Sequence, residues 1–259
     1  MGGCRHDNGV VTMSTYEEIE EYGYDEYWPT TTWLEKYKND LTESEELSRV
    51  MGGWGQGFNG DFVFEIRNLP IEDNEVQDLP EEVWKALDKG IRQLPEGVLE
   101  TVLEDAPQEV QDGIEEREGP LPDRAANELL ETKIINAPDK TWDGLRRVMP
   151  DVLEFLLEQL EENVTDDGHV YAWIGLEDGD CTAVDTLMEL DERDKGFVLT
   201  GEYEQWVRLV TSDLDVVEGI MSGELELDGD MQKILQYADA ALMMTDIASA
   251  TDKRFLFRS

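Results

Sequence analysis

The chain has 259 residues, which is enough to bury the hydrophobic core of one large domain or two small ones. Its 62 Asp and Glu residues stand against 21 Lys and Arg residues and give a formal net charge of −41. A charge of this sign and size repels nucleic acid and anionic membrane surfaces, so the composition excludes both as partners.

Acidity of this degree is also typical of disordered chains, but a hydrophobic content of 40% and seven tryptophans predict a folded protein. At molar salt the Debye length falls to about 3 Å, and repulsion between exposed carboxylates is then screened. The composition therefore indicates a halophilic protein of a salt-rich cytoplasm. Because the sequence has neither an apolar run of about 18 residues nor a signal-peptide pattern, we expect a cytoplasmic protein without stable membrane insertion.

The first part of the chain combines an acidic arm with a helix. Residues 1–29 are polar and acidic, and we expect them to form a flexible N-terminal arm. Apolar residues at helical spacing then predict a helix from Trp33 to about Met51, with a potential break at 42–44.

A glycine-rich segment, GGWGQGFNG at 52–60, contains a formal G-x-G-x-x-G pattern at Gly55, Gly57 and Gly60. A dinucleotide-binding fingerprint follows a strand and opens a helix. This segment instead follows a helix and precedes a strand at 61–67, whose apolar residues alternate. We therefore interpret it as a turn into a sheet and expect no nucleotide cofactor.

Eight of the nine prolines fall between Pro70 and Pro150. Proline favours the first positions of a helix, where its missing N–H group is not needed. Short helical patterns lie between the prolines, at 81–87, 97–104, 110–117, 124–132 and 142–148. The sequence thus predicts an inserted array of short helices over about 70–150, closed by a stronger helix at 151–163.

Strand patterns follow. Residues 169–176 and 180–190 are joined by Asp178-Gly179, a strong hairpin signal, and a third strand is expected at 196–201. A short edge strand at 224–228 alternates Leu225 and Leu227 with acidic residues. Together with 61–67 these segments predict the fold class α/β, of the α+β type, with a largely antiparallel five-stranded sheet whose one face is covered by helices.

The C-terminal region, WVRLVTSDLDVVEGIMSGELELDGDMQKILQYADAALMM at 206–244, contains two helices around a glycine turn. Asp215 is a good helix start, and Gly223 occupies the position where a helix end favours a left-handed residue. Asp230 can cap the next helix. We expect these helices at 205–221 and 231–247 to pack over the sheet.

The order helix, SGELELDGDM, helix resembles the C-terminal part of the sterol carrier protein type 2 family, in which a G-K-L-x-x-x-G-D turn links two helices that wall an apolar lipid tunnel. The matching residues are Gly223, Glu224, Leu225, Gly229, Asp230 and Met231, with Glu224 in place of the usual basic residue. The segments D-G-D-C and GFVLTGEYEQWVRLV stand where the family has its hairpin and the strand before W-x-x-L. The resemblance covers about 160–247, extends weakly over 33–67 and lacks a counterpart for 70–150. On this basis the chain is identified as a halophilic archaeal-type member with a helical insertion.

The resemblance implies one sterol-carrier-like domain over 30–250, followed by a tail at 251–259. It implies binding or transfer of an apolar lipid-like ligand, an acyl or isoprenoid chain, without catalysis or a cofactor. The residues expected to line the tunnel are Trp206, Leu209, Val210, Val217, Ile220, Met221, Leu225, Leu227, Met231, Leu235 and Met244. The alternative is a structural or regulatory interaction protein that keeps the fold without a ligand and offers the insertion to a protein partner.

Residue patterns typical of catalytic or metal sites are missing from the sequence. His6 lies in the arm, and we expect His169 to be a surface or capping residue at a strand start. The segment Asp228-Gly229-Asp230 lacks the spacing of a calcium loop, so we expect no metal. Cys4 and Cys181 are too few for a disulfide framework, and we expect Cys181 in the core.

Overall fold

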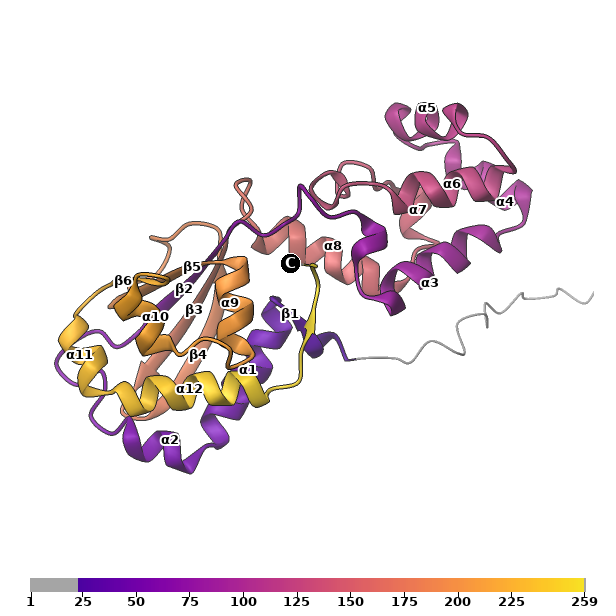
Figure 1. Ribbon diagram of the computed structural model, residues 1–259. Coiled ribbons are helices and arrows are strands. Elements are labelled where there is room, and N and C mark those ends of the chain that lie inside the picture. Colours follow the sequence, from indigo (N-terminus) through magenta and orange to yellow (C-terminus); the bar gives the residue numbers. More distant parts are fainter. Residues whose placement is uncertain (1–22, 259) are drawn as a thin grey trace, which may run out of the picture.

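The structure, a computed structural model, describes residues 23–258. Figure 1 shows two parts side by side: a sheet with helices over one face, and a lobe of short helices, with the helix α8 (Asp151–Asn163) running between them. Among residues 23–258, no helix is both long and apolar enough to cross a membrane.

The sheet has five strands in the order β4-β3-β2-β5-β6. Their bounds are β2 (Phe62–Arg67), β3 (Val170–Glu177), β4 (Asp180–Leu187), β5 (Phe197–Glu202) and β6 (Glu226–Asp228). The pairings of β2 with β3, β3 with β4 and β5 with β6 are antiparallel, and β2 pairs with β5 in parallel. The predicted fold class is confirmed, as a mixed sheet in which antiparallel pairings dominate.

The hairpin between β3 and β4 is a two-residue turn with positive φ at both central residues, 51° at Asp178 and 93° at Gly179. These are the angles of a type I′ turn, whose twist matches that of the flanking strands. The predicted strand at 180–190 ends earlier, at Leu187.

Before the sheet, the chain forms α1 (Thr31–Glu43) and α2 (Glu45–Val50), which are separated where the sequence predicted a break. Ser44 causes the break, because its extended backbone leaves α1 and its hydroxyl accepts from the N–H of Leu47 at 3.2 Å, as the N-cap of α2. The glycine-rich segment forms turns that lead into β2, and Trp54 donates its indole N–H to the carbonyl of Gly60 at 2.8 Å.

The two expected C-terminal helices are each divided in the structure. The segment 205–221 forms α9 (Tyr203–Val210) and α10 (Val216–Ser222), because Ser212 has a positive φ of 60° and Asp215 caps a new start. The segment 231–247 forms α11 (Met231–Gln236) and α12 (Ala238–Ala250), divided at Tyr237. Gly223, with φ of 79°, ends α10 in the left-handed conformation, as predicted.

The lobe contains five helices and two single 3₁₀ turns. They are η2 (Val76–Asp78), α3 (Glu81–Arg92), α4 (Glu96–Leu103), α5 (Gln108–Glu116), α6 (Leu121–Leu130), η3 (Ile134–Asn136) and α7 (Asp143–Arg146). The predicted short helices are therefore present. Prolines 80, 95, 107, 120 and 150 are the N-cap residues of α3, α4, α5, α6 and α8. The chain leaves the sheet and returns at one point, where the N–H of Leu69 donates to the carbonyl of Gly168 at 3.0 Å.

The two ends of the described chain lie side by side. β1 (Tyr27–Trp28) pairs in parallel with β7 (Arg254–Phe255), next to the 3₁₀ turn η1 (Tyr24–Glu26). Tyr27 and Trp28 are buried, as are Leu256 and Phe257. The last part of the expected arm and most of the expected tail therefore belong to the packed body, while Cys4 and His6 lie outside the described residues.

The two faces of the sheet differ. Successive residues of a strand point to opposite faces, and Phe62, Phe64 and Ile66 of β2 point towards the helices. Val63, Val198 and Trp173 point to the opposite face, together with Leu187. The loop between β4 and β5 covers that second cluster, since the indole N–H of Trp173 donates to the carbonyl of Asp194 at 3.1 Å. Cys181 is buried, and burial raises the pKa of its thiol to about 12.

Candidate functional site

An apolar cavity of about 150 Å³ lies between the sheet and the helices that cover it. Every strand of the sheet contributes to its wall, from Thr186 on the edge strand β4 to Leu227 on the edge strand β6. With neighbouring strands about 4.8 Å apart, the five strands give the wall a width of about 19 Å. The cavity therefore crosses the whole sheet.

Most of the remaining wall comes from helices before and after residues 70–150, and Val76, Leu79, Ile134 and Ala137 of that segment also line the cavity. Helix α1 contributes Trp33, Leu34 and Tyr37, α8 contributes an aliphatic stripe, and α9, α10 and α12 close the other side. The main residues of this helical wall are Trp33, Leu34, Tyr37, Leu153, Leu156, Leu157, Leu160, Trp206, Leu209, Val210, Val216, Ile220, Ala241, Met244 and Ala248. Of the residues that the structure describes, 23–258, no Lys, Arg, His, Asp or Glu lines the wall.

Backbone carbonyls bind the polar atoms of the large aromatic wall residues. The indole N–H of Trp206 donates to the carbonyl of Glu65 at 2.9 Å, and that of Trp33 donates to the carbonyl of Asp252 at 3.2 Å. The hydroxyl of Tyr37 donates to the carbonyl of Met244 at 2.9 Å, and burial raises the pKa of this phenol well above its usual range. The aromatic rings are thus held at fixed positions with their hydrogen-bonding needs met by protein.

The structure places six of the eleven expected tunnel residues on the wall of the cavity: Trp206, Leu209, Val210, Ile220, Leu227 and Met244. Leu225 is fully buried beside the wall, packed against Gly201 and Gly219. Val217 and Met231 are half-buried outside it. Met221 and Leu235 lie on the surface, with 68% and 49% of their areas exposed.

The wall residues of 28–37, of α8 and of the segments 69–79 and 134–137 were not among those expected from the sequence. The apolar spacing of α8 identified its stripe as a packed face, but a wall residue and a core residue give the same periodic signal. A wall residue differs from a core residue because it faces a gap between the sheet and the helices. The width of that gap depends on residues far apart in the chain.

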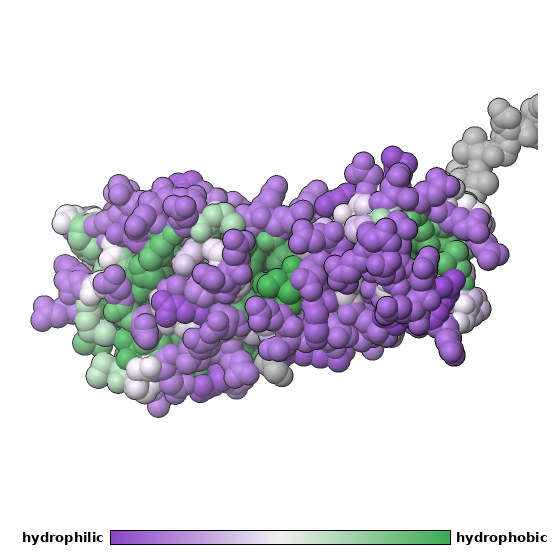
Figure 2. All heavy atoms as spheres, turned by 90° about the horizontal axis from the view of Figure 1, so that it is seen from above, coloured by the Kyte–Doolittle hydropathy of each residue, from purple (hydrophilic) through white to green (hydrophobic). Residues whose placement is uncertain are grey.

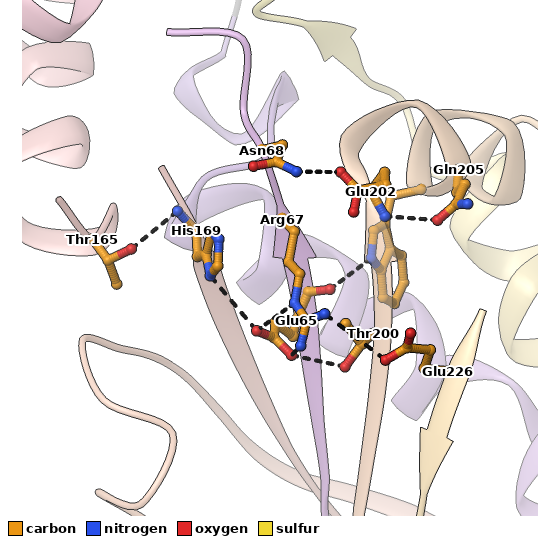
Figure 3. A network of polar contacts seen from close by, with 10 residues as sticks. Glu65, Arg67, Asn68, Thr165, His169, Thr200, Glu202, Gln205 and Glu226 are labelled. Atoms are coloured by element: carbon orange, nitrogen blue, oxygen red, sulfur yellow. Dashed lines mark hydrogen bonds and ion pairs between the residues drawn. The ribbon is translucent and has the colours of Figure 1, made fainter. Parts of the chain in front are cut away.

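A polar network lies on the outer face of the sheet, opposite the cavity (Figure 3). The carboxylate of Glu65 accepts from Nε of Arg67 at 2.9 Å and from the hydroxyl of Thr200 at 2.7 Å, and Nδ1 of His169 lies 3.6 Å away. Burial raises the pKa of Glu65, but the hydrogen bonds from Arg67 and Thr200 and the neighbouring positive charge outweigh it, so the pKa lies below its usual value.

Because Trp206 bonds to the backbone of Glu65, this network also holds one wall residue in place. Each polar atom of Glu65 is occupied by a protein partner, which makes the network a structural one. Within the described residues 23–258, no group of three or more His, Cys, Asp or Glu side chains is placed to hold a metal ion.

The fold and the cavity define an α+β domain that encloses an apolar space between sheet and helices. Residues 134–241 match the SCP-2 sterol transfer family, a family known for binding and transferring lipids. The matched segment contains α8, four of the five strands and the helices α9 to α11, and it begins inside the expected insertion at 70–150. The search of curated proteins found no match.

The comparison with solved structures returns a crystal structure of sterol carrier protein 2, at 14% identity and a TM-score of 0.43, covering 85% of this chain and 95% of that chain. A second is the solution structure of a conserved hypothetical protein from Thermus thermophilus, described as a possible sterol carrier protein, at 14% identity and a TM-score of 0.45, covering 87% of this chain and 90% of that chain. A third, a UbiJ-SCP2 ubiquinone synthesis protein, has 21% identity and a TM-score of 0.21 and covers 29% of this chain and 58% of that chain.

Proposed function

We propose that the protein binds, and can transfer, a lipid-like ligand whose apolar chain occupies the cavity, without chemistry on the ligand. The observation that carries the proposal is an uncharged, mostly apolar wall supplied by all five strands and by helices α1, α8, α9, α10, α11 and α12. Binding would remove the ligand's apolar surface from water, which contributes about 25 cal/mol per Å². The family match over 134–241 supports the same function.

The size of the cavity bears on how a ligand enters. An apolar cavity of about 150 Å³ stays dry and holds one benzene-sized molecule. A longer acyl or isoprenoid chain therefore requires wall side chains to move apart. The short helices α10 and α11 flank the turn at Gly223 and hold few buried residues, Val216 and Gly219 in α10 and Ile234 in α11, so we expect the widening there.

Uptake of a fluorescent acyl chain at high salt tests this function. Ile220→Trp places a larger side chain on the wall and should abolish saturable uptake, because the space for the chain is filled. Met221→Trp is the matched control, since Met221 is the next residue of α10 and is 68% exposed. The control should bind like the wild type.

Solvent extraction of the purified protein, followed by mass spectrometry, gives an independent readout through co-purified lipid. If the wild type shows neither co-purified lipid nor saturable uptake, the lipid function is refuted and an interaction protein built on the same fold takes its place. The acidic composition further leads us to propose that the protein works in the salt-rich cytoplasm of a halophile.

A further inference from the structure

The wall of the cavity has a polar end at the edge strand β4. Thr31 at the start of α1, Gln159 and Asn163 on α8, and Thr186 on β4 all contribute to the wall there. Each of the four is half-buried, whereas the middle of the wall is made of buried apolar residues. This cluster is therefore the half-buried, polar part of the wall on the β4 side.

Each hydrogen bond within the cluster has a defined donor and acceptor. The backbone N–H of Thr31 donates to Oε1 of Gln159 at 2.9 Å. The hydroxyl of Thr186 donates to Oδ1 of Asn163, so the hydroxyl of Thr31, 3.0 Å from that of Thr186, acts as a donor to it. A backbone N–H can only donate, and this fixes the orientation of the Gln159 amide.

The cluster keeps unused hydrogen-bonding groups of both kinds. Within the described part of the chain, the NH₂ groups of Gln159 and Asn163 have no protein acceptor, while Oγ1 of Thr31 retains a lone pair after donating its proton. Two amide donors beside a hydroxyl acceptor match a ligand group that both accepts and donates a hydrogen bond. An alcohol hydroxyl is such a group, whereas a carboxylate only accepts.

The charges around the cluster also favour an alcohol over a carboxylate. Among residues 23–258 no cationic side chain lines the wall, and Arg193, which lies near this edge, pairs with Asp185 through two of its nitrogens. A carboxylate head would lose part of its hydration without a counter-charge, inside a protein of net charge −41. A neutral hydroxyl has no charge to desolvate and therefore avoids this free-energy cost.

We propose that Thr31, Gln159, Asn163 and Thr186 form a subsite for the hydroxyl of a neutral long-chain alcohol. The hydrocarbon chain extends from this end across the sheet towards Leu227 on β6. The inference rests on the proposed lipid-binding function and names its ligand class. The cavity volume of about 150 Å³ favours a flexible single chain over a rigid fused-ring skeleton.

The test compares three ligands of one chain length, dodecanol, dodecanoate and 1-chlorododecane, as competitors of a fluorescent acyl probe at high salt and pH 8. We expect dodecanol to bind the wild type about tenfold more tightly than either of the others, because it gains hydrogen bonds that 1-chlorododecane lacks. Gln159→Leu should reduce dodecanol binding about tenfold and leave 1-chlorododecane binding unchanged. Glu158→Leu, an exposed neighbour on α8, is the matched control and should alter neither.

The outcomes distinguish the two proposals. If none of the three ligands binds the wild type, the lipid-binding function itself is refuted. If dodecanoate or 1-chlorododecane binds as tightly as dodecanol, the function stands and the alcohol subsite is refuted. The subsite is also refuted if Gln159→Leu weakens dodecanol and 1-chlorododecane equally, because the residue then acts only on the shape of the cavity.

Discussion

The helical lobe and the sheet half of the protein are alike in charge and unlike in packing. Residues 70–150 carry 21 Asp and Glu against 9 Lys and Arg, an excess of acid similar in density to that of the rest of the chain. Figure 2 shows a mostly hydrophilic face over both parts, with hydrophobic residues in separate patches. The cores differ: Val83, Leu99, Val110, Ala125 and Ala126 of the lobe are completely buried, while the cavity lies over the sheet and takes only Val76, Leu79, Ile134 and Ala137 of its wall from 70–150.

The difference shows how anchored aromatic rings keep a space open. In the lobe, small residues such as Ala125 and Ala126 let short helices approach closely. In the sheet half, Trp33, Tyr37 and Trp206 are tied by their polar atoms to backbone carbonyls and cannot move into the gap. An empty apolar volume of about 150 Å³ destabilises a protein by on the order of 4 kcal/mol. A ligand that fills it would recover part of that free energy.

The largest expected effect concerns the charge that both regions share. Raising KCl from about 0.1 to 3 M should increase the unfolding midpoint steeply, since the Debye length at molar salt is only about 3 Å. Thermal unfolding followed by circular dichroism and tryptophan fluorescence measures it for the whole molecule. A profile that is flat in salt would contradict the halophilic interpretation and would require another explanation of the net charge of −41.

The second prediction tests the difference in packing with a matched pair of substitutions. Ala126→Leu adds volume to a completely buried site of the lobe and should reduce the free energy of unfolding by about 1–3 kcal/mol. Ala248→Leu, at a buried position of the cavity wall, adds the same atoms next to a void and should be neutral or stabilising by up to about 1 kcal/mol. Chemical denaturation gives both values, and equal destabilisation would mean that the cavity is closed in solution.

The third prediction concerns the polar network behind the cavity wall. The pKa of Glu65 is lowered, so its contribution to stability is present above the unfolded-state pKa of about 4.3 and is lost as pH falls through the folded-state pKa. Glu65→Gln should therefore lower the free energy of unfolding by about 1–3 kcal/mol at pH 7 and make the acid-side decline less steep. Denaturation at pH 3 to 7 measures the loss of stability and the steepness of its decline. If the stability of wild type and variant falls in parallel as pH is lowered, the lowered pKa of Glu65 is contradicted.

Features governed by a few neighbouring residues were predictable from the sequence. The turn at Asp178 and Gly179, the helix end at Gly223 and the cap at Asp230 follow local rules, and the structure confirms all three. The proline-led helices of the lobe belong to the same group, because proline restricts its own backbone and that of its neighbour.

Features that depend on distant residues were not predictable in the same way. The pairing of β1 with β7 joins residues more than two hundred positions apart. Met221 and Leu235 have the spacing of a buried stripe, yet both lie on the surface, because helices as short as α10 and α11 take their orientation from tertiary contacts. The wall residues of α1 and α8 could not be recognised, since the sequence does not tell how far apart two layers lie.

The hydrogen bond between Leu69 and Gly168 has a consequence for how the sequence of this protein can evolve. The chain departs from the sheet at the end of β2 and re-enters next to the same point before β3, so the alignment of those strands does not depend on how many residues lie between. The entropy of closing such a loop grows only slowly with its length. Val76, Leu79, Ile134 and Ala137 of this region line the cavity, but residues 80–133 contribute nothing to its wall. Segments within 80–133 can therefore be gained, lost or exchanged while the wall stays intact, which lets the outer lobe diversify at its own pace.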